Sequence, residues 1–395
     1  MPPPFQALPD DPPPGSLPDP APETTTGSGP AAGPGAADAA APRGAPGGVH
    51  LAEGRLGLLG PPASGKSTFL AALRIAVEQG APGWMLYGED DDSNRFLKES
   101  TDRLRRQRVF PSATANLMPN MRFVLRGPRH VVRRRGLRSR REKEVAAVVL
   151  DVLDAPGGLY GGHAPEAVPE PSEDGTGLGS GAAAPKGAAS FSTGEQARLA
   201  SHLANSAGLI LLVDPVGEES ENDAYDHFQS VVLEIAKGSA LLSRDEFLPQ
   251  YLAVCLTKFD HPHVYGKARE LGLVSEMSGT PGFPYVPERM AKEYFTELCE
   301  GPRPGKGWSS SSARQLRNAI RQHFSPRRTR FFMTSAVGFH LDPVTGLFRS
   351  SDPMNVSYES ATDGGSRPWI TGDVRPVNVL EPVLWLAATQ VRNRS

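Results

Sequence analysis

One nine-residue segment, Gly60-Pro-Pro-Ala-Ser-Gly-Lys-Ser-Thr68, constrains the fold of this chain more than any other feature. It fits the pattern G-x-x-x-x-G-K-[ST] of phosphate-binding loops. An apolar stretch at 55–59 precedes it and predicts a strand, and an amphipathic pattern at 66–79 follows it and predicts a helix. Such a loop works through backbone N–H groups that converge at a helix N-terminus, so the strand and the helix are the context it needs. The sequence therefore predicts a P-loop α/β domain.

The residue types within this loop suggest a role for each position. Pro61 and Pro62 have no N–H, so the phosphate contacts must come from the residues after them. Lys66 is expected to neutralise charge between the β- and γ-phosphates, and the Ser67 hydroxyl to ligate Mg²⁺. The predicted phosphate-side ligands are Gly60, Ala63, Ser64, Gly65, Lys66, Ser67 and Thr68.

Strand and helix patterns alternate over the rest of the chain. Strands are predicted at 121–125, 145–153, 208–213, 251–256 and 330–334, and helices at 222–237, 287–300, 311–324 and 379–392. The first two of these strands flank a basic stretch at 126–143 and are expected to pair as an antiparallel ribbon. This alternation predicts a three-layer α/β sandwich with a mostly parallel sheet.

Low-complexity segments divide the chain. Residues 1–50 are rich in Pro, Ala and Gly and are expected to form a disordered tail. Residues 51–395 then form the domain, with large loop insertions expected near 126–143, 158–192, 262–325 and 337–376.

Charge and cysteine content narrow the classes of function. Lys+Arg is 42 and Asp+Glu is 44, and this near-neutral balance argues against a dedicated nucleic-acid binder. The basic stretch 126–143 leaves nucleic acid, lipid headgroups or an acidic partner open, with a solvated hairpin tip favoured over all three. The two cysteines cannot form a disulfide scaffold, and no apolar run approaches a membrane span of about 20 residues. We therefore expect a cytoplasmic protein.

Two further polar clusters are interpreted as ordinary loops. Residues 89–92 are acidic but lack the regular spacing of a calcium loop. His261 and His263 have no cysteine nearby and do not predict a zinc site.

A second motif follows the strand predicted at 145–153. Asp154-Ala-Pro-Gly157 is an Asp-x-x-Gly sequence at a strand end, where the Asp154 carboxylate could hold the hydration shell of Mg²⁺ and the Gly157 N–H could meet a γ-phosphate. Asp151 competes for the metal role, and the glycine three residues on favours Asp154.

A third motif, Thr257-Lys258-Phe-Asp260, follows the strand predicted at 251–256. A carboxylate at Asp260 would accept hydrogen bonds from guanine N1–H and N2–H₂, a donor pair that adenine lacks. The Lys258 stem would lie along the purine ring. A fourth, Thr334-Ser335-Ala336, could present a backbone N–H to guanine O6.

The order of these four motifs resembles that of the Ras-like P-loop GTPases. Within them the chain is most similar to a bacterial double-GTPase group linked to conflict (defence) systems, through the stretches 58–68, 110–114 and 377–386. The resemblance implies that Thr114 is the switch I threonine, a ligand of Mg²⁺, with Thr101 as its main alternative. It also implies that Lys66, Thr114 and Gly157 act in hydrolysis. Gly158 stands where the family usually has a water-orienting Gln, and Thr257 where it usually has Asn.

The expected function is that of a guanine-nucleotide switch. It would bind GTP·Mg²⁺, hydrolyse it slowly to GDP, and change the shape of loops near 100–119 and 155–195 to regulate an unidentified partner protein. Two alternatives stay open. One is a non-hydrolysing nucleotide-binding scaffold, which Gly158 favours, and the other is an ATP-binding P-loop protein.

Overall fold

The computed structural model describes ten stretches of the chain: residues 55–61, 64–111, 121–135, 138–152, 204–217, 224–238, 246–277, 283–300, 311–360 and 366–392. Met1–His50 and Leu51–Ser395 are separate units, and everything described here belongs to the second. The disordered tail therefore stays a prediction, as does the insertion at 158–192, because both lie outside the described residues.

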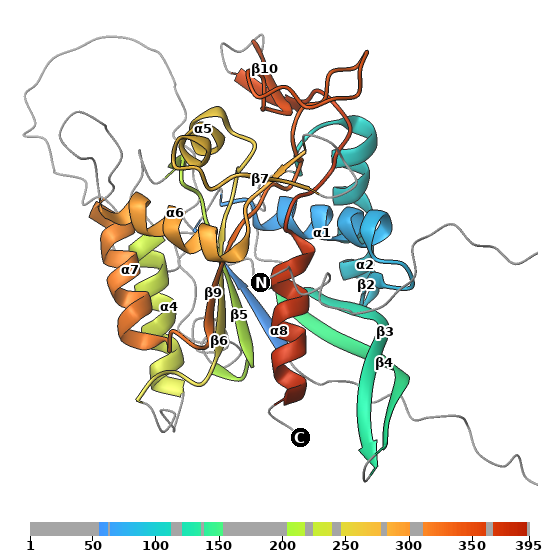
Figure 1. The fold of residues 1–395 in the computed structure, drawn as a ribbon, viewed down its shortest axis with the longest axis vertical. Helices are drawn as coiled ribbons and strands as arrows, with labels where there is room; N and C mark the ends of the chain where they lie inside the picture. Colours follow the sequence, from blue (N-terminus) through green and yellow to red (C-terminus); the bar gives the residue numbers. More distant parts are fainter. Residues whose placement is uncertain are drawn as a thin grey trace, which may run out of the picture. The chain divides into compact units, whose positions relative to one another are not determined.

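A mostly parallel, seven-stranded sheet forms the centre of the described chain (Figure 1). Its order is β2 (Met85–Gly88), β3 (Met121–Arg135), β4 (Arg138–Val152), β1 (Arg55–Leu59), β5 (Gly208–Val213), β6 (Tyr251–Leu256) and β9 (Thr329–Met333). The five strands from β4 to β9 are parallel, and β3 is antiparallel to both of its neighbours. This confirms a mixed α/β fold. It also confirms the antiparallel ribbon that was predicted from the two strands flanking the basic stretch.

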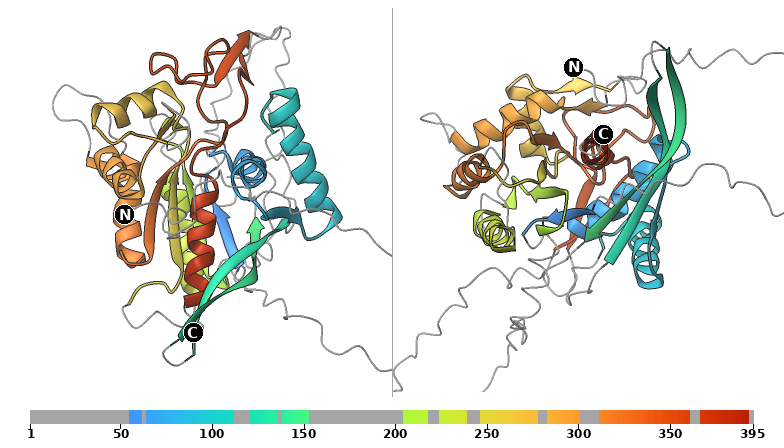
Figure 2. Two further views of the ribbon diagram at one scale, coloured as in Figure 1. Left: turned by 45° about the vertical axis from the view of Figure 1, so that its right-hand side comes forward. Right: turned by 90° about the horizontal axis from the view of Figure 1, so that it is seen from below.

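Helices cover both faces of this sheet, as β5 illustrates. Its residues alternate between two hydrophobic cores, with Leu209 and Leu211 in one and Ile210 and Leu212 in the other. The first core is closed by α4 (Ala224–Gly238), α5 (Pro262–Glu270), α6 (Glu288–Glu300) and α7 (Ser311–His323), and the second by α1 (Lys66–Gly80) and α8 (Leu380–Arg392). Figure 2 shows α8 and α1 on the opposite side of the sheet from α4 and α7.

The interpretation of residues 89–92 as a loop was wrong for its last part. Helix α2 (Asp91–Asp102) begins there, and the Asp90 side chain caps it by accepting a hydrogen bond from Ser93 N over 2.7 Å. That N–H bond lowers the pKa of Asp90. The acidic cluster is thus a helix start, whose negative charge suits the helix dipole.

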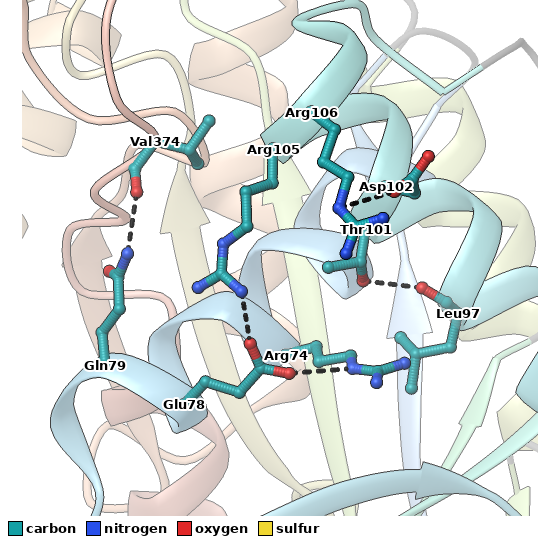
Figure 3. Close-up of polar contacts among 9 residues, drawn as sticks. All are labelled: Arg74, Glu78, Gln79, Leu97, Thr101, Asp102, Arg105, Arg106 and Val374. Atoms are coloured by element: carbon teal, nitrogen blue, oxygen red, sulfur yellow. Dashed lines mark hydrogen bonds and ion pairs between the residues drawn. The ribbon is translucent and has the colours of Figure 1, made fainter.

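The loop expected near 100–119 is also shorter than predicted. Residues up to Asp102 belong to α2, and the π-helical turn η1 (Arg103–Gln107) continues it. Glu78 of α1 contacts this turn, because one carboxylate oxygen accepts from Arg105 while the other accepts from Arg74 of its own helix (Figure 3). Residues 112–120 lie outside the described residues.

The described part of 262–325 is mostly helical, whereas the described part of 337–376 is mostly loop, with one pair of strands. They hold α5, α6, α7 and two hairpins, formed by β7 (Ser275–Glu276) with β8 (Pro284–Tyr285) and by β10 (Val356–Ser360) with β11 (Ser366–Ile370). His261 caps α5, so the pair His261 and His263 begins a helix. Among the described helices, none combines the length and apolar character needed to cross a membrane.

Candidate nucleotide site

All four sequence motifs follow strands whose carboxyl ends lie at one edge of the sheet. The five parallel strands fix this, since parallel neighbours end on the same side. Strand β1 lies between β4 and β5. The strands that follow it first, β2 to β4, lie on one flank of β1 in the sheet, and the later strands β5, β6 and β9 lie on the other flank. Ligands of open α/β sheets bind at such a switch point, outside the strand ends. The loop at 60–68 begins there, directly after β1.

Two glycines give the loop its path. Gly65 is the N-cap of α1 in the left-handed conformation, with φ 94°, which favours glycine over any residue with a side chain. Among the described residues, apart from its chain neighbours, none has an atom within 4 Å of the position that a Cβ would take there. At Gly60 a Cβ would lie 3.0 Å from Leu212 O and closer still to Ser64 Oγ. Glycine at 65 thus suits the backbone conformation, and glycine at 60 suits the close approach of Ser64 and Leu212.

Lys66 and Ser64 are the buried polar groups of this loop. Lys66 is 7% exposed, and its Nζ donates to Gly60 O over 2.9 Å and to Pro61 O over 3.1 Å. The Ser64 hydroxyl is buried, and no described residue forms a hydrogen bond with it. A buried, unpartnered hydroxyl costs free energy unless something bonds to it. A phosphate oxygen would give the Ser64 hydroxyl a partner and would accept from Lys66 in exchange for a loop carbonyl, so the residues present fit an anionic ligand.

Two of the remaining predicted phosphate ligands are described, and both lie at the start of α1. Ser67 and Thr68 are half-buried in the first turn of α1, where backbone N–H groups have no partner within the helix. Ala63 lies outside the described residues, so its predicted contact stays a prediction.

Thr114 and Asp154, predicted to hold the metal, and Gly157, predicted to meet the γ-phosphate, also lie outside the described residues. Their two competitors are described, and both are engaged elsewhere. Asp151 is buried between Arg55, at 3.7 Å, and Arg122, at 3.2 Å. Thr101 donates its hydroxyl to Leu97 O over 2.6 Å within α2 (Figure 3). The metal roles of Asp154 and Thr114 stay predictions, and Ser67 is the described member of that set.

On the base side, the third and fourth motifs meet. Asp260 is 5% exposed, and Ser335 Oγ donates to its Oδ1 over 2.5 Å. Gly338 N donates in turn to Ser335 Oγ over 2.8 Å. Burial raises the pKa of Asp260 to about 6, and the Ser335 hydrogen bond opposes that shift. The carboxylate is therefore held in a fixed orientation, and Ala336 follows directly after its partner.

The backbone of the third motif is fixed by neighbouring strand ends. Thr257 donates both its N–H, over 2.8 Å, and its hydroxyl, over 3.2 Å, to Val213 O at the end of β5. Phe259 N donates to Thr334 O over 3.0 Å at the end of β9. The threonine that stands in place of Asn thus braces the loop through its own hydroxyl.

One residue of this edge was missed by the sequence analysis. Asp214 directly follows β5 and forms an ion pair with Lys258, which adopts φ 55° in the left-handed region. The carboxylate also accepts from Val216 N over 3.0 Å. Its position directly after a buried strand that neighbours β6 was the available signal. Asp214 therefore sets where the Lys258 ammonium lies.

Comparisons with known proteins give weak likenesses. No protein-family model and no curated protein matches the chain. Among solved structures it is similar to a bacterial selenocysteine-specific elongation factor, EF-Sec, at 13% identity and a TM-score of 0.22, over 56% of this chain and 23% of that one. It is also similar to a Thermus thermophilus protein, ttk003000868, at 14% identity and a TM-score of 0.25, over 72% of this chain and 37% of that one. The chain spans well under half the length of either protein, and scores this low carry no argument about function.

Proposed function

We propose that this chain binds guanine nucleotide as GTP·Mg²⁺ and acts as a slowly hydrolysing molecular switch. The observation that carries the proposal is the hydrogen bond between Ser335 and Asp260 at the edge of the sheet where the loop at 60–68 also lies. A phosphate-binding loop alone suits many nucleotides. A buried, oriented carboxylate after β6, two strands along the sheet from β1, adds a choice of base.

The chemistry of Asp260 supports guanine over adenine. An ionised carboxylate only accepts hydrogen bonds, and guanine presents two adjacent donors, N1–H and N2–H₂. Each carboxylate oxygen can accept more than once, so Oδ1 can hold Ser335 and still face the base. Adenine would place a lone pair opposite the carboxylate and leave it unpaired. The ATP-binding alternative is disfavoured on this ground.

The phosphate side is supported by Lys66, Ser64 and the first turn of α1. Lys66 now donates to two loop carbonyls and would exchange them for phosphate oxygens, which carry more negative charge. Ser67, with Asp154 and Thr114, would hold Mg²⁺, which would supply positive charge to the transferring phosphoryl group. The N–H groups after Gly65 would add to the same field.

We further propose that hydrolysis is slow and that a partner protein responds to it. Gly158 has no side chain with which to orient an attacking water. By resemblance to the bacterial double-GTPase group, the partner would belong to a conflict system. The competing proposal is a scaffold that keeps its nucleotide unhydrolysed, and the same Gly158 favours it.

Two measurements test the proposal. Chromatography of the nucleotide released by denaturing the purified protein should show GDP or GTP, and adenine nucleotide alone would contradict it. Phosphate release from GTP, followed over hours, should proceed near the roughly 10⁻⁴–10⁻² s⁻¹ of unassisted switch GTPases. Bound GTP that stays intact over days would favour the scaffold.

A further inference from the structure

Strands β3 and β4 continue past the sheet as a two-stranded extension, which we call the β3–β4 arm (Figures 1 and 2). It comprises residues 127–135 paired with residues 138–146. Strand β2 pairs β3 only up to Arg126, and β1 pairs β4 only from Val149 onward. Within the described chain, the arm therefore has no strand on either side. At about 3.4 Å per residue it is about 30 Å long.

The arm concentrates positive charge that the whole-chain balance hides. Residues 127–146 contain seven Arg and one Lys against two Glu, which gives 8 − 2 = +6. Because the chain totals −2, the rest of it carries −2 − 6 = −8. From the sequence, near neutrality argued against a dedicated nucleic-acid binder, and the lack of aromatic residues for base stacking favoured a solvated hairpin tip. The structure removes the first reason, since it places these charged residues together on one extension. The second concerns stacking of single strands and not contact with the backbone of a duplex.

We propose that the β3–β4 arm binds the phosphodiester backbone of nucleic acid. Seven of the eight cationic residues of the arm are arginines. A guanidinium group can donate two parallel N–H hydrogen bonds to one phosphate. A two-stranded ribbon fits the major groove of duplex DNA, which is about 12 Å wide. Duplex DNA also carries one negative charge per about 1.7 Å along its axis. An arm of about 30 Å thus meets many phosphates at once.

The composition of the arm disfavours a membrane as the partner. Residues 127–146 contain no Trp, Tyr or Phe, the side chains that anchor proteins among lipid headgroups. Protein interfaces are likewise enriched in aromatic residues at their centre. A charged, non-aromatic ribbon is suited to backbone contact with nucleic acid without reading the bases.

The arm leaves the sheet at the edge opposite the candidate nucleotide site. Val149 of β4 pairs with Arg55, the first residue of β1, whereas the loop at 60–68 follows the last residue of β1. Residues 138–146 precede Val149 and therefore extend beyond the amino-terminal edge. Nucleic acid on the arm would leave the nucleotide site open, so the two proposals can fail separately.

The test is fluorescence anisotropy of the full chain with labelled duplexes of about 20 base pairs, one of DNA and one of RNA, from about 50 to about 200 mM salt. The test variant changes Arg133, Arg134, Arg135, Arg138 and Arg140 to Gln. The matched control makes the same change at five exposed arginines elsewhere, namely Arg95, Arg106, Arg289, Arg321 and Arg327. Both variants lose five charges, so only the location of the change differs.

We expect the test variant to bind at least about thirtyfold more weakly at the lower salt, with a salt slope reduced by about four to five, and the control to stay within about threefold of wild type. Comparison of the two duplexes shows which nucleic acid is preferred. Equal losses in both variants, or no binding of the wild type to either duplex, would overturn the proposal. So would charge-dependent binding to phosphatidylserine vesicles without binding to nucleic acid, because that result assigns the arm to lipid. If the test variant melts early, the triple change at 133–135 repeats the comparison.

Discussion

Ser335 Oγ donates a hydrogen bond to Asp260 Oδ1 over 2.5 Å and so joins the loops that follow β6 and β9. Both residues are buried, and they are 75 positions apart in the sequence, a span that includes α5, α6 and α7. Two short motifs that are weak signals separately thus form one unit. Their contact fixes the Asp260 carboxylate at the edge of the sheet where the loop at 60–68 also begins.

Asp260→Asn should change the preferred base. The amide still accepts from N1–H but donates where the carboxylate accepted, which suits the C2 carbonyl of xanthine better than the C2 amino group of guanine. The affinity for GTP should fall by at least about a hundredfold, and the affinity for XTP should rise. Competition of GTP, ATP and XTP against a fluorescent guanine nucleotide measures both. Asp373→Asn, at a carboxylate that is 77% exposed, is the control and should change neither. Equal competition by ATP and GTP on the wild type would remove the guanine assignment.

The same substitution should stabilise the nucleotide-free protein at neutral pH. The pKa of Asp260 rises from 3.8 to about 6 on folding, so the native state binds more protons than the unfolded state between these values. Wild-type stability should therefore fall as pH rises from about 4 to about 6, by on the order of 2–3 kcal/mol. Asp260→Asn has no carboxylate to titrate and keeps this stability. Its free energy of unfolding in urea should therefore exceed that of the wild type near pH 7 and equal it near pH 4. An Asn variant that is less stable than wild type at pH 7 would contradict the desolvated state of Asp260.

Lys66→Ala should abolish tight binding of GTP and GDP. The change removes a buried cation from the phosphate side, where a charge-assisted contact is worth a few kcal/mol. Affinity by calorimetry should fall by at least about a hundredfold. Lys98→Ala, at an exposed position on α2, is the matched control and should bind like wild type. Unchanged affinity in Lys66→Ala would falsify the phosphate-binding role of the loop.

The central strands were predictable because local pattern and tertiary context agree there. The strands at 55–59, 208–213 and 251–256 were predicted with the bounds that the structure has, since a strand buried on both faces is a continuous apolar run. Strand β2 was missed because its exposed Met85 and Tyr87 alternate with small or buried residues over only four positions.

The site was predictable where a motif names its chemistry, and less so where a partner comes from another strand. Nothing in the residues around Asp214 identifies Lys258 as its ion-pair partner, because the two are brought together by strand order. Likewise the engagement of Thr101 with Leu97 depends on α2, which the polar sequence of 91–102 concealed. Contacts between elements distant in sequence have no local pattern to read.

Removal of residues 1–48 should leave nucleotide binding and the melting temperature nearly unchanged. The segment is rich in Pro, Ala and Gly and has no apolar periodicity with which to pack on the domain. Calorimetric affinity for GTP and thermal melting of the shortened chain measure both. A melting temperature lowered by more than about 4 °C, which corresponds to roughly 1–2 kcal/mol, would show that the tail packs on the domain.

Asp214→Asn should weaken guanine nucleotides without changing the choice of base. Asp214 holds Lys258 by an ion pair, and Lys258 occupies a left-handed backbone conformation that costs a non-glycine residue about 1–2 kcal/mol. Loss of the pair releases the ammonium and with it the alkyl stem proposed to lie along the purine ring. The affinities for GTP and GDP should both fall by about five- to thirtyfold, because the Lys258 stem would contact the base and not the γ-phosphate. The ratio of GTP to ATP affinity should stay high, since Asp260 is untouched.

Lys258→Met separates the role of the stem from that of the ammonium. It keeps an apolar stem and removes the charge, so no ion pair with Asp214 is needed to place the side chain. If the stem contributes more to binding than the ammonium does, Lys258→Met should bind GTP more tightly than Asp214→Asn. A purely structural role for Asp214 predicts the opposite pattern, in which Asp214→Asn lowers the melting temperature while the affinity of the folded fraction for GTP stays at the wild-type value.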